Sequence, residues 1–379
     1  MKIRKTSAVI IALLIFVLGA ATGLGISNAI MPGSSISSVS GDQGRYDKVN
    51  ELWGIIEKNY YIEPNEEDMK DGLARGLFIG LGDKYSAYMT KEEYESYETS
   101  VTGEFDGIGV TFQMNKDGEF EVISTVKNSP AEKAGVKKGD IITKVDGKEY
   151  DDADKIGAAM RGKRGTKVKV TYERDGKENT VSITRAHIVT ETVTSKMLGD
   201  NIGYIKISAF EEKTDADFES ALSEMESKAA RGVIIDLRDN GGGLVKSGVN
   251  IADKLLGKCV VTYMEDRKGD KEYYRSDSDC TQLPYVLLVN GNTASASEIL
   301  SAAVKDKGRG KIVGTQTYGK GVVQVSGKLS DGSGYRLTIM QYFSPNGKAI
   351  HEKGVKPDYV VKGKDAQLKK AEELIKKGF

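Results

Sequence analysis

The stretch VNGNTASASEI, residues 289–299, joins an apolar run to a helical pattern and decides the class of fold. The run that leads into it, YVLLVN, has the length and composition of a buried strand, and a helix is expected from about Ser295. The same alternation surrounds it: NIGYIKIS, DADFESALSEMESKAA, GVIIDLR, LVKSGVNIADKLL and KIVG read in turn as strands and helices. Strands that alternate with helices indicate parallel strands joined by crossover helices. We therefore expect an α/β core over residues 187–362.

The junction itself offers hydroxyl groups at Thr293, Ser295 and Ser297. Ser295 followed by Glu298 is a capping box, which is the ordinary start of a helix. The same junction also favours developing negative charge, because the first N–H groups of a helix lack partners and the positive end of the helix dipole lies there. The N–H of Ala296 would be a natural oxyanion donor. A serine that acts as a nucleophile here still needs a base.

A histidine base is not indicated by the sequence. The chain has 2 histidines, His187 and His351, and both stand in polar loop contexts. A Ser-His-Asp triad is compatible with that number, but nothing in the pattern marks one.

A lysine is the other chemically sensible base, because burial disfavours its charged form and can leave a neutral amine near working pH. The candidate is Lys320 in GTQTYGKGVVQV, where Gly319 and Gly321 give the backbone freedom before a predicted strand. Gln324 stands four residues further on, so we expect both side chains on one face, with the glutamine orienting the lysine. The alternative is a solvated loop lysine.

The segment IIDLRDNGGGL, residues 234–244, has the order strand, glycines, helix. It lacks both glycine patterns of nucleotide-binding loops. Either it is a plain tight turn, or Gly241 or Gly242 brings a backbone N–H close to a ligand as the second oxyanion donor.

Residues 103–186 consist of short β-rich runs separated by turn signals, with two helical pieces, SPAEKAG and DADKIGAAMRG. This pattern predicts a compact β-barrel-like domain. Amides in its GIGV loop could capture a terminal carboxylate while the adjacent strand edge pairs with an extended peptide. Ile156 is expected to lie near the last side chain of that peptide. The candidate substrate-binding residues are Gly107, Ile108, Gly109, Val110 and Ile156.

The N-terminus predicts a membrane anchor. Lys2, Arg4 and Lys5 precede an apolar run, and no further charge follows until Asp42. This arrangement favours a single transmembrane signal-anchor over residues 8–30, with residues 1–7 in the cytoplasm and the remainder outside. The competing interpretation is a signal peptide cleaved near residues 27–29. A Gly/Ser-rich linker follows over residues 31–45.

The remaining features concern the two ends of the described organisation, the cysteines and the charge. Apolar residues at helical spacing predict a small helical region over residues 46–100, and residues 363–379 read as a charged helix that is either a solvated tail or a partner contact. Cys259 and Cys280 flank a predicted hairpin, which a disulfide could staple, or they are unpaired thiols. Lys+Arg 55 against Asp+Glu 55 does not point to nucleic acid, and we assign no metal or cofactor.

Together these residues resemble the C-terminal processing peptidases, or tail-specific proteases. The resemblance covers roughly residues 46–362 and rests on GLGDKYSAYMT, GIGV, SPAEKAGVKKGDIITKVDG, DLRDNGGGL, TASASEI, GTQTYGKGVVQ and YFSPNGKAIHEKGVKPD. It implies a crotonase-like α/β protease core with an inserted PDZ domain over residues 101–186. It also implies an extracytoplasmic serine endopeptidase that acts on proteins with accessible, apolar C-terminal tails, and it leaves a homo-oligomer open.

The resemblance further assigns roles to the site residues. Ser295 would be the nucleophile, Lys320 the general base and Gln324 its orienting residue, with N–H groups of Gly241 and Ala296 stabilising the oxyanion. Gly241 stands where relatives often carry proline, so the choice of glycine donor stays open. A membrane-tethered PDZ scaffold without activity is disfavoured by the intact Ser295, Lys320 and Gln324. A trypsin-like protease is disfavoured because the β domain precedes the nucleophile.

Overall fold

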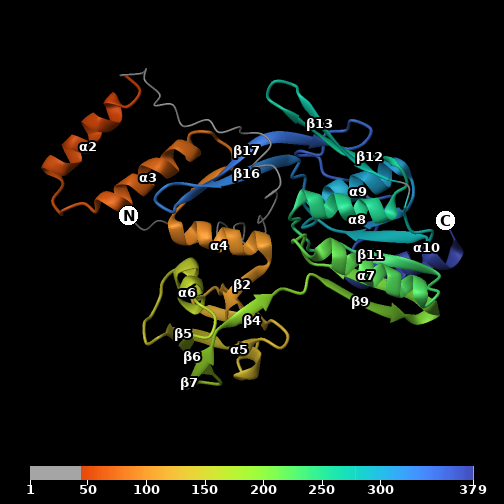
Figure 1. The fold of residues 1–379 in the computed structure, drawn as a ribbon, viewed down its shortest axis with the longest axis horizontal. Coiled ribbons are helices and arrows are strands. Elements are labelled where there is room, and N and C mark those ends of the chain that lie inside the picture. The colour runs from red at the N-terminus through yellow and green to blue at the C-terminus, as the bar shows by residue number, and fades with distance from the viewer. Residues whose placement is uncertain (1–43, 278, 379) are drawn as a thin grey trace.

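The computed structural model describes residues 44–277 and 279–378 (Figure 1). The expected transmembrane segment, residues 8–30, lies outside these residues, as does most of the expected linker. Among the described residues no helix combines the length and the apolar character needed to cross a bilayer.

The core is a sheet of six strands in the order β18-β15-β14-β11-β10-β9. Its strands are β9 (Val193–Leu198), β10 (Ile202–Ile207), β11 (Gly232–Asp236), β14 (Tyr285–Val289), β15 (Lys311–Gly314) and β18 (Tyr359–Val360). The helices around it are α7 (Thr214–Ser227), α8 (Val245–Leu255), α9 (Ala296–Lys307) and α10 (Lys364–Lys377), and a short 3-10 turn, η1 (Gly199–Asn201), precedes β10. All neighbours pair in parallel except β9 with β10. The predicted parallel α/β core is therefore confirmed.

Hydrophobic residues cover both faces of this sheet, as parallel strands require. Successive residues of β14 alternate between two clusters: Leu287 belongs to the core under α7, α8 and α9, and Leu288 to the core under α10. Leu374 and Ile375 of α10 are buried in the second cluster. One face of the C-terminal helix is therefore part of the core, so the expectation of a solvated tail was wrong, and a partner contact by the remaining face stays a prediction.

A second sheet brings together segments far apart in the chain. It contains β1 (Ala87–Met89), β12 (Cys259–Asp266), β13 (Lys271–Ser276), β16 (Val322–Lys328) and β17 (Gly334–Phe343). Strand β17 pairs with β1, β12 and β16. The predicted hairpin is β12 with β13, where Cys259 faces Ser276, and both cysteines are free thiols.

The β-rich domain is inserted between β1 and the core sheet and lies below α4 in Figure 1. Its main sheet runs β3 (Val110–Met114), β4 (Phe120–Thr125), β5 (Ile141–Val145), β6 (Lys167–Arg174) and β7 (Lys177–Thr184). Its helices are α5 (Pro130–Lys133) and α6 (Ala153–Met160), and β2 (Glu104–Gly107) pairs with β8 (Ala186–Val189) at its base. It has a hydrophobic core of its own.

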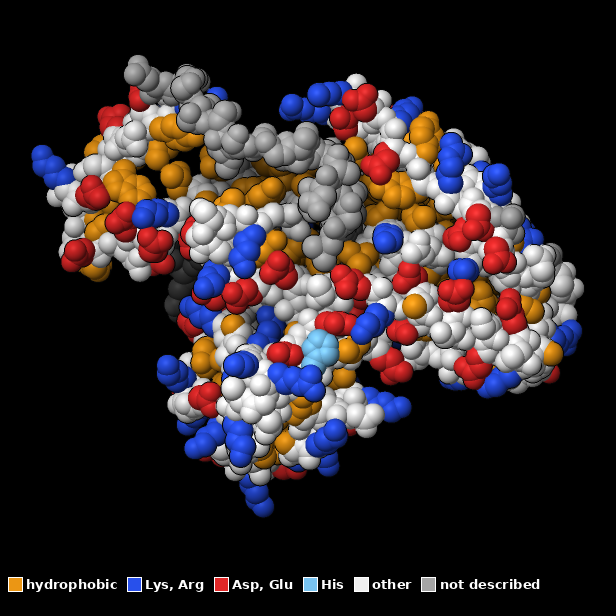
Figure 2. Space-filling view, in the orientation of Figure 1, with side chains coloured by type: hydrophobic (Ala, Val, Ile, Leu, Met, Phe, Trp, Pro, Cys, Tyr) orange, Lys and Arg blue, Asp and Glu red, His pale blue; other side chains and the backbone are white. Residues whose placement is uncertain are grey.

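The N-terminal region forms α2 (Asp47–Asn59), α3 (Glu66–Ile79) and α4 (Lys91–Thr102). Helix α4 starts with a capping box between Thr90 and Glu93 and buries Tyr94 and Tyr97. Helices α2 and α3 form an arm that projects from the rest of the molecule, and neither has a buried residue (Figure 1). Hydrophobic side chains gather on this arm (Figure 2).

Candidate active site

Ser295 lies at the turn between β14 and α9 in an unusual backbone conformation, with φ 56° and ψ −120°. A non-glycine residue in such a region costs about 1–3 kcal/mol, and such strain gathers at functional sites. The side chain is fully buried, and its Oγ has no hydrogen-bond partner among the described residues. The hydroxyl therefore does not cap the helix and remains available for chemistry.

Glu298 occupies the other half of the expected capping box and does more than cap. Its Oε2 accepts the N–H of Ser295 at 3.0 Å and the N–H of Lys320 at 2.8 Å. Its Oε1 accepts the N–H of Gly319 at 2.7 Å and the hydroxyl of Thr317 at 2.5 Å. Burial raises the pKa of Glu298 to about 7, although these donors oppose the shift. The carboxyl group thus joins the turn of Ser295 to the turn of Lys320, a role that the sequence did not reveal.

Lys320 is enclosed within the protein, with 1% of its surface exposed. Burial lowers the pKa of Lys320 to about 7, and the charge of Arg336 acts in the same direction. The carboxylates of Glu298 and Asp83 oppose the shift. A lysine in this state is partly neutral near pH 7 and can accept a proton. The alternative of a solvated loop lysine was wrong.

Lys320 and Gln324 are related less simply than we expected. Lys320 lies in the turn before β16, and the strand has a register shift between Val323 and Gln324. The alternation of side chains along a regular strand therefore does not establish that Lys320 and Gln324 lie on one face, as we expected. Gln324 is buried, and its Nε2 donates to Thr338 Oγ1 at 3.2 Å.

Tyr342 and His351 also lie beside the turn of Lys320. The buried hydroxyl of Tyr342 donates to the carbonyl oxygen of Lys320, and Ser295 and Glu298 are close enough to influence the pKa of Tyr342, which burial raises. A Cβ on Gly321 would come within 2.1 Å of the backbone nitrogen of His351, so only glycine fits. His351 is thus a neighbour of the site. His187 lies in β8 and pairs with Glu104 and Asp106.

The glycine loop after β11 packs directly against the serine. A Cβ on Gly242 would come within 2.6 Å of the Cβ of Ser295, and its φ is 102°. The N–H of Gly242 is already used, since it donates to Asn240 Oδ1 at 2.8 Å. Within the described residues, the N–H groups of Gly241 and Ala296 have no protein acceptor. Of the two glycines that we considered, Gly241 is therefore the one whose N–H has no protein acceptor, and it directly precedes the glycine that contacts Ser295.

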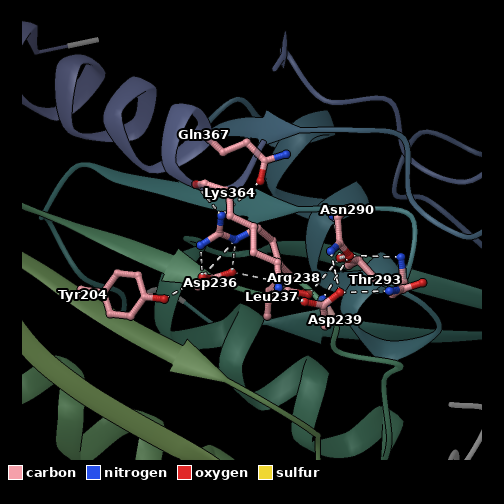
Figure 3. Close-up of polar contacts among 10 residues, drawn as sticks. Tyr204, Asp236, Leu237, Arg238, Asp239, Asn290, Thr293, Lys364 and Gln367 are labelled. Atoms are coloured by element: carbon pink, nitrogen blue, oxygen red, sulfur yellow. Dashed lines mark hydrogen bonds and ion pairs between the residues drawn. The ribbon is translucent and has the colours of Figure 1, made fainter. Parts of the chain in front are cut away.

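Polar contacts hold this loop in place (Figure 3). Arg238 forms an ion pair with Asp236 at 2.5 Å and donates to Lys364 O at 2.8 Å, which ties the loop to α10. Asp239 and Asn290 exchange hydrogen bonds of 3.0 and 2.8 Å between the glycine loop and the turn that leads to Ser295. These bonds join the glycine loop to α10 on one side and to the turn of Ser295 on the other.

The inserted β domain carries a pocket of about 50 Å³ between the GIGV loop and α6. The loop contributes Ile108, Gly109 and Val110, and Gly109 has a φ of 78°. The α6 side contributes Gly157, Met160 and Arg161. Ile156 does not line this pocket, because its side chain is fully buried in the core of the domain. Its neighbour Gly157 lines the pocket instead, and the expected proximity of Ile156 to the last side chain of a bound peptide stays a prediction. Gly107 ends β2 at the start of the loop.

A larger cavity of about 590 Å³ adjoins this pocket. It shares Phe105 and Arg161 with the pocket and extends along α4 to Ser326 of β16. The pocket of the β domain is thus connected to the strand that follows Lys320.

Comparison with known proteins agrees with this architecture. Residues 201–361 match Peptidase family S41, and residues 107–184 match the PDZ domain family. The Carboxy-terminal processing protease CtpA of Bacillus subtilis is 36% identical over 357 residues, which cover 93% of this chain and 74% of that protein. The chain belongs to peptidase family S41. It is a serine protease of the C-terminal processing type with a PDZ domain, as the resemblance implied.

Two further similar proteins support the assignment. A Probable CtpA-like serine protease of Staphylococcus haemolyticus is 34% identical over 355 residues, covering 92% of this chain and 71% of that protein. The solved structure of the photosystem II D1 C-terminal processing protease is 28% identical, with a TM-score of 0.52, and the match covers 82% of this chain and 86% of that chain.

Proposed function

We propose that this S41 protease cleaves peptide bonds with a Ser295–Lys320 dyad and passes through an acyl-enzyme. The observation that carries the proposal is the nearly complete burial of Lys320, with a pKa of about 7, in a turn that Glu298 ties to Ser295. A lysine amine in this state can act as a general base without a histidine.

In the proposed first step, the Oγ of Ser295 forms a bond to the scissile carbonyl carbon while its proton moves to the Nζ of Lys320. The N–H groups of Gly241 and Ala296 stabilise the oxyanion. The C–N bond then breaks, and Lys320 returns the proton to the leaving amine. In the second step Lys320 accepts a proton from water as the water oxygen bonds to the ester carbonyl carbon. The C–O bond to Ser295 then breaks, and Lys320 returns the proton to Ser295 Oγ, which releases the carboxylic acid product and restores the free enzyme. Gln324 is the proposed orienting residue for the lysine.

We further propose that the PDZ domain receives the apolar C-terminal tail of the substrate protein in the pocket beside α6. The N–H groups of residues 107–110 would bind the terminal carboxylate, and the adjacent guanidinium of Arg161 adds a positive charge. The cavity that extends from Arg161 to Ser326 supports a path for the preceding residues toward Lys320.

The test is a fluorophosphonate probe that reacts with activated serines, followed by mass spectrometry of the labelled peptide. We expect label on Ser295 only, and loss of both label and casein cleavage in Ser295→Ala. Ser297→Ala is the matched control, because its Oγ bonds to Asn240 O at 3.2 Å and is expected to retain substantial activity. Label on Ser297 would overturn the assignment. A folded wild-type chain without label would favour a non-catalytic PDZ scaffold.

We also propose that residues 8–30 anchor the protease in the cell membrane as a single-pass helix, with the catalytic domain outside the cytoplasm. The support is the basic cluster before an uncharged apolar run. A tag at Phe379 should be digested by protease added to cells stripped of outer layers. Protection of the tag would contradict this topology, and release of a shortened chain would indicate signal-peptide cleavage.

Finally, we propose that the arm formed by α2 and α3 pairs with the same arm of a second copy. Its apolar residues are exposed although they stand at helical spacing: Leu52 53%, Ile55 50%, Leu73 40%, Leu77 66% and Ile79 78%. Helices without a core of their own gain stability by burying such a face, and a closed symmetric dimer buries it once on each copy.

A further inference from the structure

The segment before β1 contacts the proposed base from a distant part of the chain. The ring centroid of Tyr85 lies 5.4 Å from the Nζ of Lys320, and Tyr85 is 3% exposed. Tyr85 stands 235 residues before Lys320 and outside the residues that match Peptidase family S41. The motif GLGDKYSAYMT, which supported the resemblance, thus reaches the active site although no role was assigned to it.

Several hydrogen bonds hold Tyr85 in this position. Its N–H donates to Asp83 Oδ1 at 2.9 Å, and its carbonyl accepts from Arg336 Nε at 2.8 Å. Ser86 Oγ donates to Asp83 Oδ2 at 2.6 Å and accepts the N–H of Thr338 at 2.9 Å. The segment is therefore fastened to β17, which is the strand that pairs with β16.

Other aromatic and charged groups surround the same ring. His351 packs edge-on against Tyr85, with centroids 6.2 Å apart, and Lys84 Nζ lies 4.9 Å from the Tyr85 centroid. The charged groups that act on Lys320 are Arg336 on β17, Glu298 on α9 and Asp83, which lies in the same segment as Tyr85. In contrast to these charged groups, Tyr85 places apolar surface next to the amine of Lys320.

We propose that Tyr85 is a positioning residue for Lys320, because its ring closes the enclosure around the amine and excludes water from it. The inference rests on the proposed Ser-Lys mechanism and deepens it. If so, the segment that contains Tyr85 forms one wall of the active site. The residues that match family S41 then do not by themselves enclose Lys320.

The ring has two opposite effects on the amine. Its face attracts an ammonium group, which favours the charged form, and its bulk excludes water, which favours the neutral form. Since Lys320 is almost fully enclosed, we expect exclusion of water to be the larger effect. Opening the enclosure should therefore raise the pKa of Lys320 toward its ordinary value and move the onset of activity to higher pH.

The experiment measures the rate at which a fluorophosphonate labels Ser295 from pH 5 to 10, using the full chain in detergent micelles. This readout does not depend on substrate binding or on the PDZ domain. The test variants are Tyr85→Leu, which removes the ring, and Tyr85→Gln, which places a polar group beside the amine. Tyr85→Phe retains the ring. Tyr88→Leu is the matched control, since Tyr88 lies on β1, is 7% exposed and donates to Asp71 instead.

We expect a wild-type midpoint near pH 7, and in Tyr85→Leu and Tyr85→Gln a midpoint that is higher by about one pH unit or more. Labelling at pH 6 should then fall about tenfold for each pH unit by which the midpoint rises, and it should recover at pH 9 to 10. Tyr85→Phe and Tyr88→Leu should keep the wild-type midpoint, although Tyr88→Leu loses thermal stability.

The proposal would be overturned if the midpoint is unchanged or lowered in Tyr85→Leu or Tyr85→Gln, provided that circular dichroism shows the variant to be folded. Failure of the dyad and failure of the Tyr85 role give different results. If the wild-type chain is not labelled at Ser295, the proposed function is wrong. If the wild type is labelled with a midpoint near pH 7 and the Tyr85 variants share that midpoint, only the role of Tyr85 is wrong.

Discussion

The backbone N–H groups of Ser295 and Lys320 donate to one oxygen atom, Oε2 of Glu298, at 3.0 and 2.8 Å. The two residues are 25 positions apart and belong to different turns, so this shared acceptor sets the relation between the proposed nucleophile and the proposed base. The second oxygen of the carboxyl group binds Gly319 and Thr317, which leaves Glu298 surrounded by donors.

Replacing Glu298 should therefore disable the site through geometry. Glu298→Gln keeps the size of the side chain but turns one acceptor oxygen into an N–H₂ donor that faces other donors. We expect at least a hundredfold loss of casein cleavage and a destabilisation of about 1–3 kcal/mol, as for buried unsatisfied groups. Activity and urea denaturation measure the two effects. Near-wild-type activity in a folded Glu298→Gln would contradict the role of the carboxyl group.

Lys320→Met should be inactive and yet more stable at pH 7. The folded-state pKa of Lys320 is about 7, against 10.5 for an ordinary lysine. Between these values the unfolded chain binds more protons than the folded chain, so wild-type stability rises with pH across this window. Methionine removes that dependence, and we expect a gain of a few kcal/mol at pH 7 that shrinks toward pH 10.

Denaturation of wild type and Lys320→Met at pH 7, 8.5 and 10 tests this expectation. Lys328→Met is the control, because Lys328 lies at the exposed end of the same strand and should change neither activity nor the pH dependence. Lys320→Arg should also be inactive, since a guanidinium group stays protonated. An active Lys320→Arg would exclude the lysine as base.

Gly242→Ala should abolish activity through a contact with Ser295. The added Cβ would meet Ser295 Cβ at 2.6 Å and Ala294 O at 2.7 Å, and the positive φ of 102° is unfavourable for alanine. Gly257→Ala is the matched control, since no atom lies within 4 Å of its added Cβ. Fluorophosphonate labelling and thermal unfolding of both variants give the comparison. Equal labelling of Gly242→Ala and Gly257→Ala would contradict this prediction, because it would show that the glycine loop can move away from Ser295 without loss of reactivity.

The arm of α2 and α3 should control assembly. Leu52→Glu combined with Leu77→Glu places charge on the apolar face, so we expect a dimer to become a monomer in light scattering after size-exclusion chromatography. Lys58→Glu, also on α2, changes charge without removing apolar surface and should leave the dimer intact. A wild-type monomer at micromolar concentration would contradict the proposed pairing.

Local patterns in the sequence were sufficient to predict the strands and helices of the core. The alternation of apolar strands with helical segments predicts parallel pairing because short crossovers allow few other arrangements. The glycines in the turn of Lys320 and in the loop of Gly242 were recognisable for a similar local reason, since left-handed backbone and close approach both favour glycine. The choice of Ser295 over Ser297 and of Lys320 as base came from residue type, spacing and resemblance, and it remains a prediction.

The tertiary structure decided what surrounds these residues. Glu298 looked like a helix cap because its local partner is Ser295, while its bonds to Thr317, Gly319 and Lys320 join segments that only folding brings together. Tyr85 reaches Lys320 through the pairing of β1 with β17. The burial that lowers the pKa of Lys320 likewise comes from segments that are far apart in the sequence. By itself, the sequence determined which groups this protein has for chemistry, because backbone conformation and periodicity are local. Only the fold decided their protonation and enclosure, because burial and electrostatics depend on contacts between residues that the chain keeps far apart.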